Sequence, residues 1–498
     1  MLCAPRVHAR VVSRLKEKVS PWECARMAFD QENHSANREE TMSDCTATQE
    51  QQETFVQAMS ERMTQLAQQL SQWLLSTEPT LAEMEQQVLQ TVKELGNALL
   101  GALASLRAPR YPVQSVACGC GQQAVYQRAR SAQVDSLLGC IHLKRAYYLC
   151  ASCHHGQAPL DQQLGFCAGG QSARLTEILA LMGALCPFEE AVQLIQKLSL
   201  VTVSANSSKA ATEQLGQSII QAEQQALATA WSSSKPTLPP APTSIPERLY
   251  VSMDGTTVHT RAEGWKEIKL GAFYTTTTHV SAKRPAQLDI RAADISFYAD
   301  FAEPQQFGRA LYLEGYRRGA AQAKEVVAIG DGAHWIWKLV AEHFPNAIQI
   351  VDWYHASQYV WNVAKAVYGE GTALATRWAH NRLDDLWEGQ VGKVMAAIQK
   401  HLKRGGEAAQ AALSYYTINQ ERMRYPDYRA RGIQIGSGSI ESGCKHLIAQ
   451  RLKQAGMIWN VAGARNVAKV RACLKSRRWD ETIALRQPPA RSYQRSAA

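Results

Sequence analysis

The chain has 498 residues, of which 46% are hydrophobic. This length exceeds the size at which one hydrophobic core usually stops growing, so we expect two or more folded units. The formal net charge of +10 favours polyanionic partners such as nucleic acids. From Glu421 to the end, 16 Lys and Arg stand against 5 Asp and Glu, a surplus of 11 that matches the whole-chain excess. The C-terminal tract is therefore the first candidate for nucleic-acid contact.

The chain contains twelve cysteines spread over its length. Its first residues fit neither a secretory signal peptide nor a membrane span, so we expect reduced thiols in a cytoplasmic protein without a membrane partner. Residues 1–44 predict a poorly patterned leader. Met42 is an alternative start to Met1, and both a misassigned start codon and a functional leader remain open.

Two amphipathic helices are predicted over residues 45–108. Apolar residues recur at steps of three or four from Phe55 to Leu74, and again from Leu81 to Leu103. The two helices can form a hairpin or pair with another copy of the chain. Ordinary core packing in a helical domain gives the same pattern.

Short strands and turns are predicted over residues 109–170, where they carry two cysteine pairs. Cys150-Ala-Ser-Cys153 has the usual spacing of zinc ligands, whereas Cys118-Gly-Cys120 leaves only one residue between its thiols. Two close pairs on separate turns can bind one structural Zn²⁺ and stabilise a small sheet, although four ordinary thiols are the alternative. Substitute ligands nearby are Cys140, His154, His155 and Cys167.

A helical region is predicted over residues 171–231. The segment from Phe188 to Ile220 fits helix, turn, helix, which is typical of a DNA-reading motif and equally of structural packing. Residues 232–247 contain too many prolines for a helix or a central strand, so they predict a linker.

An α/β domain is predicted over residues 248–479, because strands and helices follow one another in mixed order. An all-helical insertion interrupts it at about 358–430, and residues 480–498 form a basic tail. The predicted strands are Arg248–Met253, Trp265–Thr276, Asp289–Tyr298, Glu325–Ile329 and Ala347–Val351, and the predicted helices are Pro304–Arg318 and His334–His343.

Acidic residues follow several of these strands. Asp254-Gly ends the first strand and Asp331-Gly follows the fourth, and each pair read alone is most simply a turn. If the two strands are neighbours, they lie about 4.8 Å apart and their carboxylates can share a hard cation. Asp352 can cap the helix that carries His355. Glu441 follows a glycine-rich loop at the start of another helix.

These motifs resemble those of a known family, the ISKra-four-type insertion-sequence transposases of the RNase H-like DDE class. The resemblance runs from Tyr111 to Trp479 and departs from the family at the short Cys118-Gly-Cys120 pair. The similar strings are Met-Asp254-Gly-Thr, Gly-Asp331-Gly-Ala, Asp352-Trp-Tyr-His355, Gly-Ser-Ile-Glu441-Ser, and Arg145-Ala-Tyr-Tyr-Leu-Cys150 with Pro159-Leu-Asp161.

The resemblance implies an α/β fold with an RNase H-like catalytic domain, preceded by helical, zinc-ribbon-like and helix-turn-helix-like regions. It implies a bacterial, nucleoid-associated DNA transposase that binds terminal inverted repeats and target DNA as a homo-oligomer. Asp254, Asp331 and Glu441 would hold two Mg²⁺ or Mn²⁺ ions for strand cleavage and transfer. Asp352 and His355 would support that site.

A basic helical tract after Glu441 is suited to phosphates near the cleaved bond, with a solvated charged face as the alternative. Two rival functions stay open, a structure-selective nuclease of the same fold and a domesticated DNA-binding regulator without catalysis. The predicted DNA contacts are Lys445, Arg451, Lys453, Arg465, Lys469 and Arg471.

Overall fold

The structure is a computed structural model that describes residues 49–108, 112–166, 170–232, 238, 242–280 and 288–486. The chain is mixed α/β and divides into two compact units, Met1–Gly170 with Ala490–Ala498, and Gln171–Pro489. None of the helices in these described ranges combines the length and apolarity that crossing a membrane requires. Five earlier predictions lie wholly or partly outside the described residues: the leader 1–44, the start at Met1 or Met42, Cys167, half of the 232–247 linker, and residues 487–498 of the basic tail.

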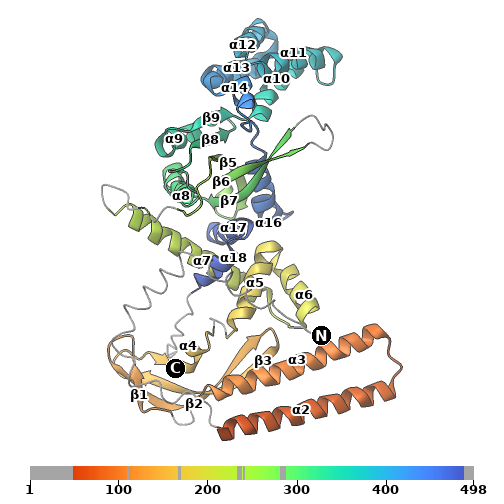
Figure 1. Cartoon of the computed structure of the whole chain (residues 1–498), viewed down its shortest axis with the longest axis vertical. Helices are drawn as coiled ribbons and strands as arrows, with labels where there is room; N and C mark the ends of the chain where they lie inside the picture. The colour runs from red at the N-terminus through yellow and green to blue at the C-terminus, as the bar shows by residue number, and fades with distance from the viewer. Residues whose placement is uncertain are drawn as a thin grey trace, which may run out of the picture. The chain divides into compact units, whose positions relative to one another are not determined.

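The first unit begins with a helical hairpin, as predicted. Helix α2 spans Gln49–Ser76 and helix α3 spans Leu81–Leu106 (Figure 1). Thr80 caps α3, because its hydroxyl accepts the N–H of Glu83 while the Glu83 carboxylate accepts the N–H of Thr80. The helix boundary therefore follows from local sequence.

A four-stranded antiparallel sheet follows, with its strands in chain order. The C-terminal half of α3 packs on this sheet, where Leu100 and Ala104 meet Val134, Ile141 and Leu143. This small core holds the hairpin to the sheet. The strands are β1 (Ser115–Ala117), β2 (Gln123–Ser136), β3 (Gly139–Cys150) and β4 (Gly156–Gln157), and they are followed by helix α4 (Pro159–Gln163).

The second unit is built on a five-stranded sheet with the order β7-β6-β5-β8-β9. Strands β5, β6 and β7 form an antiparallel meander, and β8 and β9 continue parallel to β5. All five predicted strands are present. They are β5 (Arg248–Thr260), β6 (Gly264–Val280), β7 (Leu288–Asp300), β8 (Glu325–Gly330) and β9 (Ile348–Val351).

Strand β5 does not end at Asp254, which corrects the prediction of a strand end or turn there. Its pairing with β8 stops at Ser252, whereas its pairing with β6 continues to Thr260. Asp254 therefore lies within a strand, at the point where the neighbouring strand has ended.

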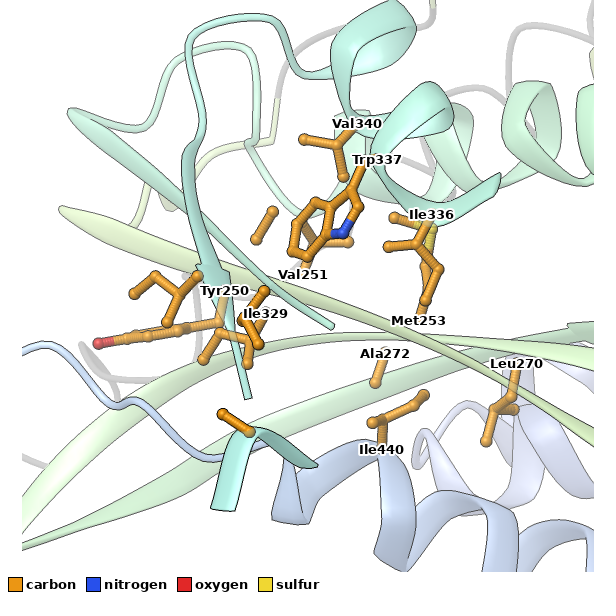
Figure 2. Packing of buried hydrophobic residues seen from close by; sticks show 14 of the residues in the cluster. Tyr250, Val251, Met253, Leu270, Ala272, Ile329, Ile336, Trp337, Val340 and Ile440 are labelled. Carbon is orange, nitrogen blue, oxygen red and sulfur yellow. The ribbon is translucent and has the colours of Figure 1, made fainter. Parts of the chain in front are cut away.

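Helices cover both faces of this sheet. On one face lie α8 (Pro304–Arg317) and α9 (His334–His343), and Figure 2 shows Ile336 and Trp337 of α9 across the sheet from Ile440. Ile440 belongs to α15 (Gly438–Gly443). A Cβ at Gly443 would lie 2.8 Å from Leu270 and from Phe297, so α15 packs unusually close to the sheet.

The predicted helical insertion is present between β9 and α15. It begins at Trp353, a few residues earlier than predicted, because Asp352 caps its first helix. Its helices are α10 (Trp353–Tyr368), α11 (Ala373–Trp387), α12 (Val391–Lys400), α13 (Leu402–Asn419) and α14 (Tyr425–Ala430), with a 3₁₀ turn η1 (Gln420–Arg422) before α14.

The helix-turn-helix-like region belongs to the second unit and is not a separate domain. Its helices are α5 (Ala173–Leu185), α6 (Phe188–Ser199) and α7 (Ala205–Ala230). Helix α7 packs along α17 (Val461–Lys475) so closely that a Cβ at Gly216 would lie 2.6 Å from the Asn466 backbone. The predicted boundary before residue 248 is therefore not a boundary between compact units.

Candidate functional site

Two carboxylates lie at one edge of the five-stranded sheet. Ser252 of β5 pairs with Ile329 of β8, and Asp254 and Asp331 each follow two residues later. The strands are parallel neighbours, which meets the condition for a shared cation, and both side chains reach the same edge of the sheet. Burial raises the pKa of Asp254 and the nearby Asp331 carboxylate adds to this, while hydrogen bonds from Cys444 and Gly255 oppose it.

Glu441 approaches this edge from α15. One helical turn after Glu441, the Cys444 thiol donates to Asp254 Oδ2 at 3.3 Å. Residues three apart share a helix face, so Glu441 lies on the face that meets Asp254. Glu441 Oε1 accepts a hydrogen bond from the Ser437 hydroxyl at 2.9 Å.

Asp352 is fully buried and links three segments. Its Oδ1 accepts the His355 N–H at 2.7 Å and lies 3.0 Å from His355 Nδ1, and its Oδ2 accepts the Ser437 N–H at 2.5 Å. The predicted helix-capping role of Asp352 is thus confirmed. Burial alone would raise the pKa of Asp352, but the hydrogen bonds from His355 and Ser437 outweigh it and lower the pKa. The hydrogen bond to Asp352 raises the pKa of His355.

Asp352, His355 and Glu441 have ligand atoms that all lie within 4.8 Å of one another. Within the described ranges, the predicted triad of Asp254, Asp331 and Glu441 does not form such a group. Asp254 instead accepts the Gly255 N–H at 2.7 Å and Asp331 accepts the Ala333 N–H at 2.8 Å. The four carboxylates and the His355 imidazole therefore lie close to one another, and Asp352 and His355 lie nearest to Glu441.

The loop that carries Asp331 is fixed by the helical insertion. The Tyr415 hydroxyl of α13 donates to the Asp331 carbonyl oxygen at 2.7 Å. Gly332 follows with a φ of 106°, and a Cβ there would lie 2.5 Å from the Tyr415 ring. The insertion thus shapes the site as well as interrupting the sheet domain.

The four predicted cysteines of the first unit form a second group. All four sulfurs lie within 4.8 Å of one another, with Cys118 and Cys153 at 3.5 Å and Cys120 and Cys150 at 3.6 Å. The short first pair therefore reaches the group, and the substitutes Cys140, His154 and His155 are not part of it. The N–H groups of Cys153 and Ser152 lower the pKa of Cys150 to about 6, which favours its thiolate.

Two of the predicted DNA contacts, Arg451 and Arg471, are buried, so that prediction is wrong for them. Arg451 donates to the Gly183 carbonyl at 3.0 Å. Arg471 donates to the Ala184 carbonyl at 2.5 Å and to the carbonyls of His446 and Leu447. The latter two belong to a π-helix, η2 (Cys444–Ala449), which directly follows α15. Both arginines therefore tie α5 to the helical segment of Glu441.

Lys469 is also buried and corrects the same prediction. Its ammonium lies 2.5 Å from Glu223 Oε2 and 3.0 Å from Asp300 Oδ2. Burial disfavours the charged form, but Glu223, Tyr298 and Asp300 outweigh it and raise the pKa of Lys469. Arg465, one turn earlier and partly exposed, pairs with both Asp300 oxygens at 2.7 and 2.9 Å.

The remaining two predicted DNA contacts stay accessible. Lys445 is exposed, and Lys453 is half-buried with its ammonium bonded to Thr256 Oγ1 at 2.5 Å, two residues from Asp254. Both therefore remain candidates.

Two site residues escaped the sequence analysis. Cys444 and Ser437 lie three residues after and four residues before Glu441, so helical spacing alone could have found Cys444. Ser437 precedes α15, and its two hydrogen bonds depend on where Asp352 lies. No sequence signal pointed to it.

A family model described as Uncharacterised protein family (UPF0236) matches residues 74–481. The chain belongs to this family. The match begins in the last turn of α2, so the UPF0236 region includes the cysteine group and the carboxylate edge. No curated protein matches the chain.

Proposed function

We propose that this UPF0236 protein is a DNA transposase that cuts and joins strands with divalent metal ions. The observation that carries the proposal is the place where these carboxylates meet. Asp254 and Asp331 each lie two residues beyond the end of the parallel pairing between β5 and β8, and Cys444 ties the helical segment of Glu441 to Asp254. The strand order β7-β6-β5-β8-β9 supports an RNase H-like fold, because three antiparallel strands followed by two parallel ones resemble the sheet of that fold.

Asp254, Asp331 and Glu441 would hold two Mg²⁺ or Mn²⁺ ions. Their donor atoms are carboxylate oxygens, the hard ligands that these cations prefer. Burial raises the pKa of Asp254, so a nearby cation would stabilise its charged form. Bound ions would lower the pKa of a water or DNA hydroxyl and stabilise charge at the phosphorus.

Asp352 and His355 would position this site. Asp352 accepts the Ser437 N–H, and the Ser437 hydroxyl donates to Glu441, so a buried anion orients the Glu441 carboxylate through one intermediate residue. In the neutral imidazole, donation from His355 Nδ1 to Asp352 would leave the lone pair on Nε2, which is the arrangement that carboxylates impose on histidines in metal sites.

The reaction would proceed in two displacements at phosphorus. In the first, a water oxygen bonds to the phosphorus at the transposon end, the bond to the 3′ oxygen breaks, and that oxygen takes the proton lost by water. In the second, the freed 3′-hydroxyl oxygen bonds to a target phosphorus, and the departing target 3′ oxygen takes its proton. Neither step needs a covalent enzyme intermediate, so the same carboxylates serve both.

DNA would be held near the carboxylate edge by the accessible Lys445 and Lys453, which can pair with phosphates. Helices α6 and α7 would recognise the terminal inverted repeats, because Asn206 and Lys209 are exposed in the first turns of α7. A homo-oligomer at the nucleoid would bring two transposon ends to target DNA.

The four cysteines would hold one structural Zn²⁺. A tetrahedral ion with Zn–S bonds of about 2.3 Å separates its sulfurs by about 3.8 Å, and the two closest sulfur pairs fit that edge. The ion would stabilise the turn at Cys118-Gly-Cys120 and the turn after β3, which share only a small apolar cluster.

The test uses purified full-length protein, Mg²⁺ and DNA fragments that carry the sequences flanking its gene. We expect cleavage and joined products for the wild type, and cleavage slower by at least about 1,000-fold for Asp331→Asn. Asp384→Asn, an exposed acid of the insertion, is the matched control.

Equal cleavage by wild type and Asp331→Asn would overturn the proposed site. Cleavage without joining would favour the structure-selective nuclease, and DNA binding without cleavage would favour the domesticated regulator.

A further inference from the structure

The helical hairpin of α2 and α3 exposes far more apolar surface than it buries. Within its two described helices, only Leu66 of α2 and Ala104 of α3 are buried. Leu75 and Leu81 are 85% and 80% exposed. Nine large apolar side chains of the hairpin are exposed: Val56, Met63, Leu74, Leu75, Leu81, Val88, Leu89, Val92 and Leu103.

Most of these side chains form one stripe on each helix. Val56, Met63 and Leu74 of α2 are separated by 7 and 11 residues, which are whole numbers of helical turns. On α3 the same face carries Leu81, Val88, Val92 and Leu103.

The two stripes share one side of the hairpin. On each helix the stripe is rotated around the helix axis by about a quarter turn from the less exposed residues, in the sense in which the helix winds from its N-terminus to its C-terminus. The less exposed residues include Phe55 and Leu66 on α2, and Met84 and Thr91 on α3. Because the helices are antiparallel, these quarter turns lead to the same side. A largely apolar face results, with Ser60 and Glu85 among its polar positions, and such a face is characteristic of a helix pair that packs against further helices.

The charge of the hairpin excludes two classes of occupant. Residues 49–106 contain seven Glu against Arg62 and Lys93, in a chain whose total charge is +10. An acidic hairpin repels nucleic acid. A membrane surface is excluded as well, because interfacial helices carry Lys and Arg on their polar face.

We propose that this face is a dimerisation surface, on which the hairpin of a second copy packs to complete an antiparallel four-helix bundle. Glu85 is the charged residue on this face of α3, and the other positions of the two stripes are apolar or uncharged, so two copies can pack this face against itself across a two-fold axis. If each of the seven side chains in the two stripes contributes roughly 100 Å² of apolar area, two copies would bury on the order of 1,400 Å², which lies in the range of standard stable interfaces. The proposal does not rest on the proposed transposase activity.

The experiment measures the mass of the full-length protein by light scattering and sedimentation equilibrium, without DNA. We expect twice the chain mass of 55.1 kDa for the wild type. Val88→Glu with Val92→Glu would bury four charges in the bundle, so we expect the dimer dissociation constant to rise at least about 100-fold. The matched control, Gln86→Glu with Gln90→Glu, adds the same charges on the opposite side of α3 and should leave the dimer intact.

Circular dichroism checks that the variant hairpin keeps its helices. If the glutamate variant loses helicity, Val88→Gln with Val92→Gln replaces it, because Gln favours helix and still removes the apolar contacts. A monomeric wild type at micromolar concentration would overturn the proposal. So would a dimer that persists in a folded stripe variant, because its interface would then lie elsewhere.

Discussion

The two candidate metal sites differ in how far apart their residues lie in the chain. The four cysteines lie between residues 118 and 153, on two turns of one antiparallel sheet, and their sulfurs already form a compact group. The carboxylate site draws Asp254, Asp331 and Glu441 from β5, the loop after β8, and α15. A local site needs one hairpin to form, whereas the carboxylate site needs the whole sheet and its covering helices.

The difference extends to what holds the ligands in place. Around the cysteines, backbone N–H groups of the same turn face Cys150. Around the carboxylates, distant groups do this work: Arg471 holds the π-helix after α15, and Tyr415 of the insertion holds the Asp331 loop. Substitutions far from the carboxylates should therefore disturb that site, while only local ones should disturb the cysteine site.

Loss of zinc should give the largest effect. Structural zinc binding contributes on the order of 10 kcal/mol to folding, so chelation or Cys150→Ser should unfold residues 112–157. Hydrogen exchange of this segment, together with zinc content per chain, measures the effect.

Cys140→Ser is the control, because Cys140 is exposed and outside the group of four sulfurs. If the purified wild type contains no zinc and its hydrogen exchange over residues 112–157 equals that of Cys150→Ser, the cysteine group is not a metal site. The contrast between a local and a long-range metal site would then fail.

Removal of the buried Lys469 ammonium should have the second-largest effect on stability. Lys469→Met leaves Glu223 without its cation and leaves Asp300 with Arg465 alone, so we expect the Gln171–Pro489 unit to lose about 3 kcal/mol of stability. Urea unfolding measures the loss. Lys475→Met, at an exposed position of the same helix, should change stability by no more than about 0.5 kcal/mol. Equal stabilities of the two variants would contradict the structural role given to Lys469.

Asp352→Asn should give the smallest of the three effects. The amide would keep one accepting oxygen but present a donor to either Ser437 or His355, both of which donate to Asp352. Glu441 would therefore lose its orientation, and DNA cleavage should slow about 10- to 100-fold. A positioning role predicts a lower kcat, unchanged DNA affinity and a higher requirement for Mg²⁺. Ser442→Ala, next to Glu441 but exposed, should behave as wild type. A Ser442→Ala variant as slow as Asp352→Asn would show that general disturbance of α15 explains the loss.

Much of the fold follows from the sequence because its signals are local. The helix over Pro304–Arg317 was predicted one residue too long, and the helix over His334–His343 was predicted with both ends correct. The helix cap at Asp352 also depends only on its own turn. In contrast, periodicity could not show that β5 passes Asp254, because that extension exists only through pairing with β6.

The basic tract shows the limit of composition most clearly. Its surplus of positive charge predicted phosphate contacts, yet Arg451, Lys469 and Arg471 are buried. Their partners include the Gly183 and Ala184 carbonyls and the Glu223 carboxylate, each more than 200 residues away in the chain. Net charge counts residues without locating their partners.

The sequence by itself determined most of the helices and strands, the four cysteines, and the position of Asp331 directly after a strand, since each depends on neighbours within a few residues. Only the tertiary structure decided which strands adjoin, that Ser437 links Asp352 to Glu441, and which cations are buried. The physical reason is the distance along the chain over which each interaction acts. Hydrogen bonding within a turn and helical periodicity act locally, whereas burial and charge pairing depend on segments that meet only when the chain folds.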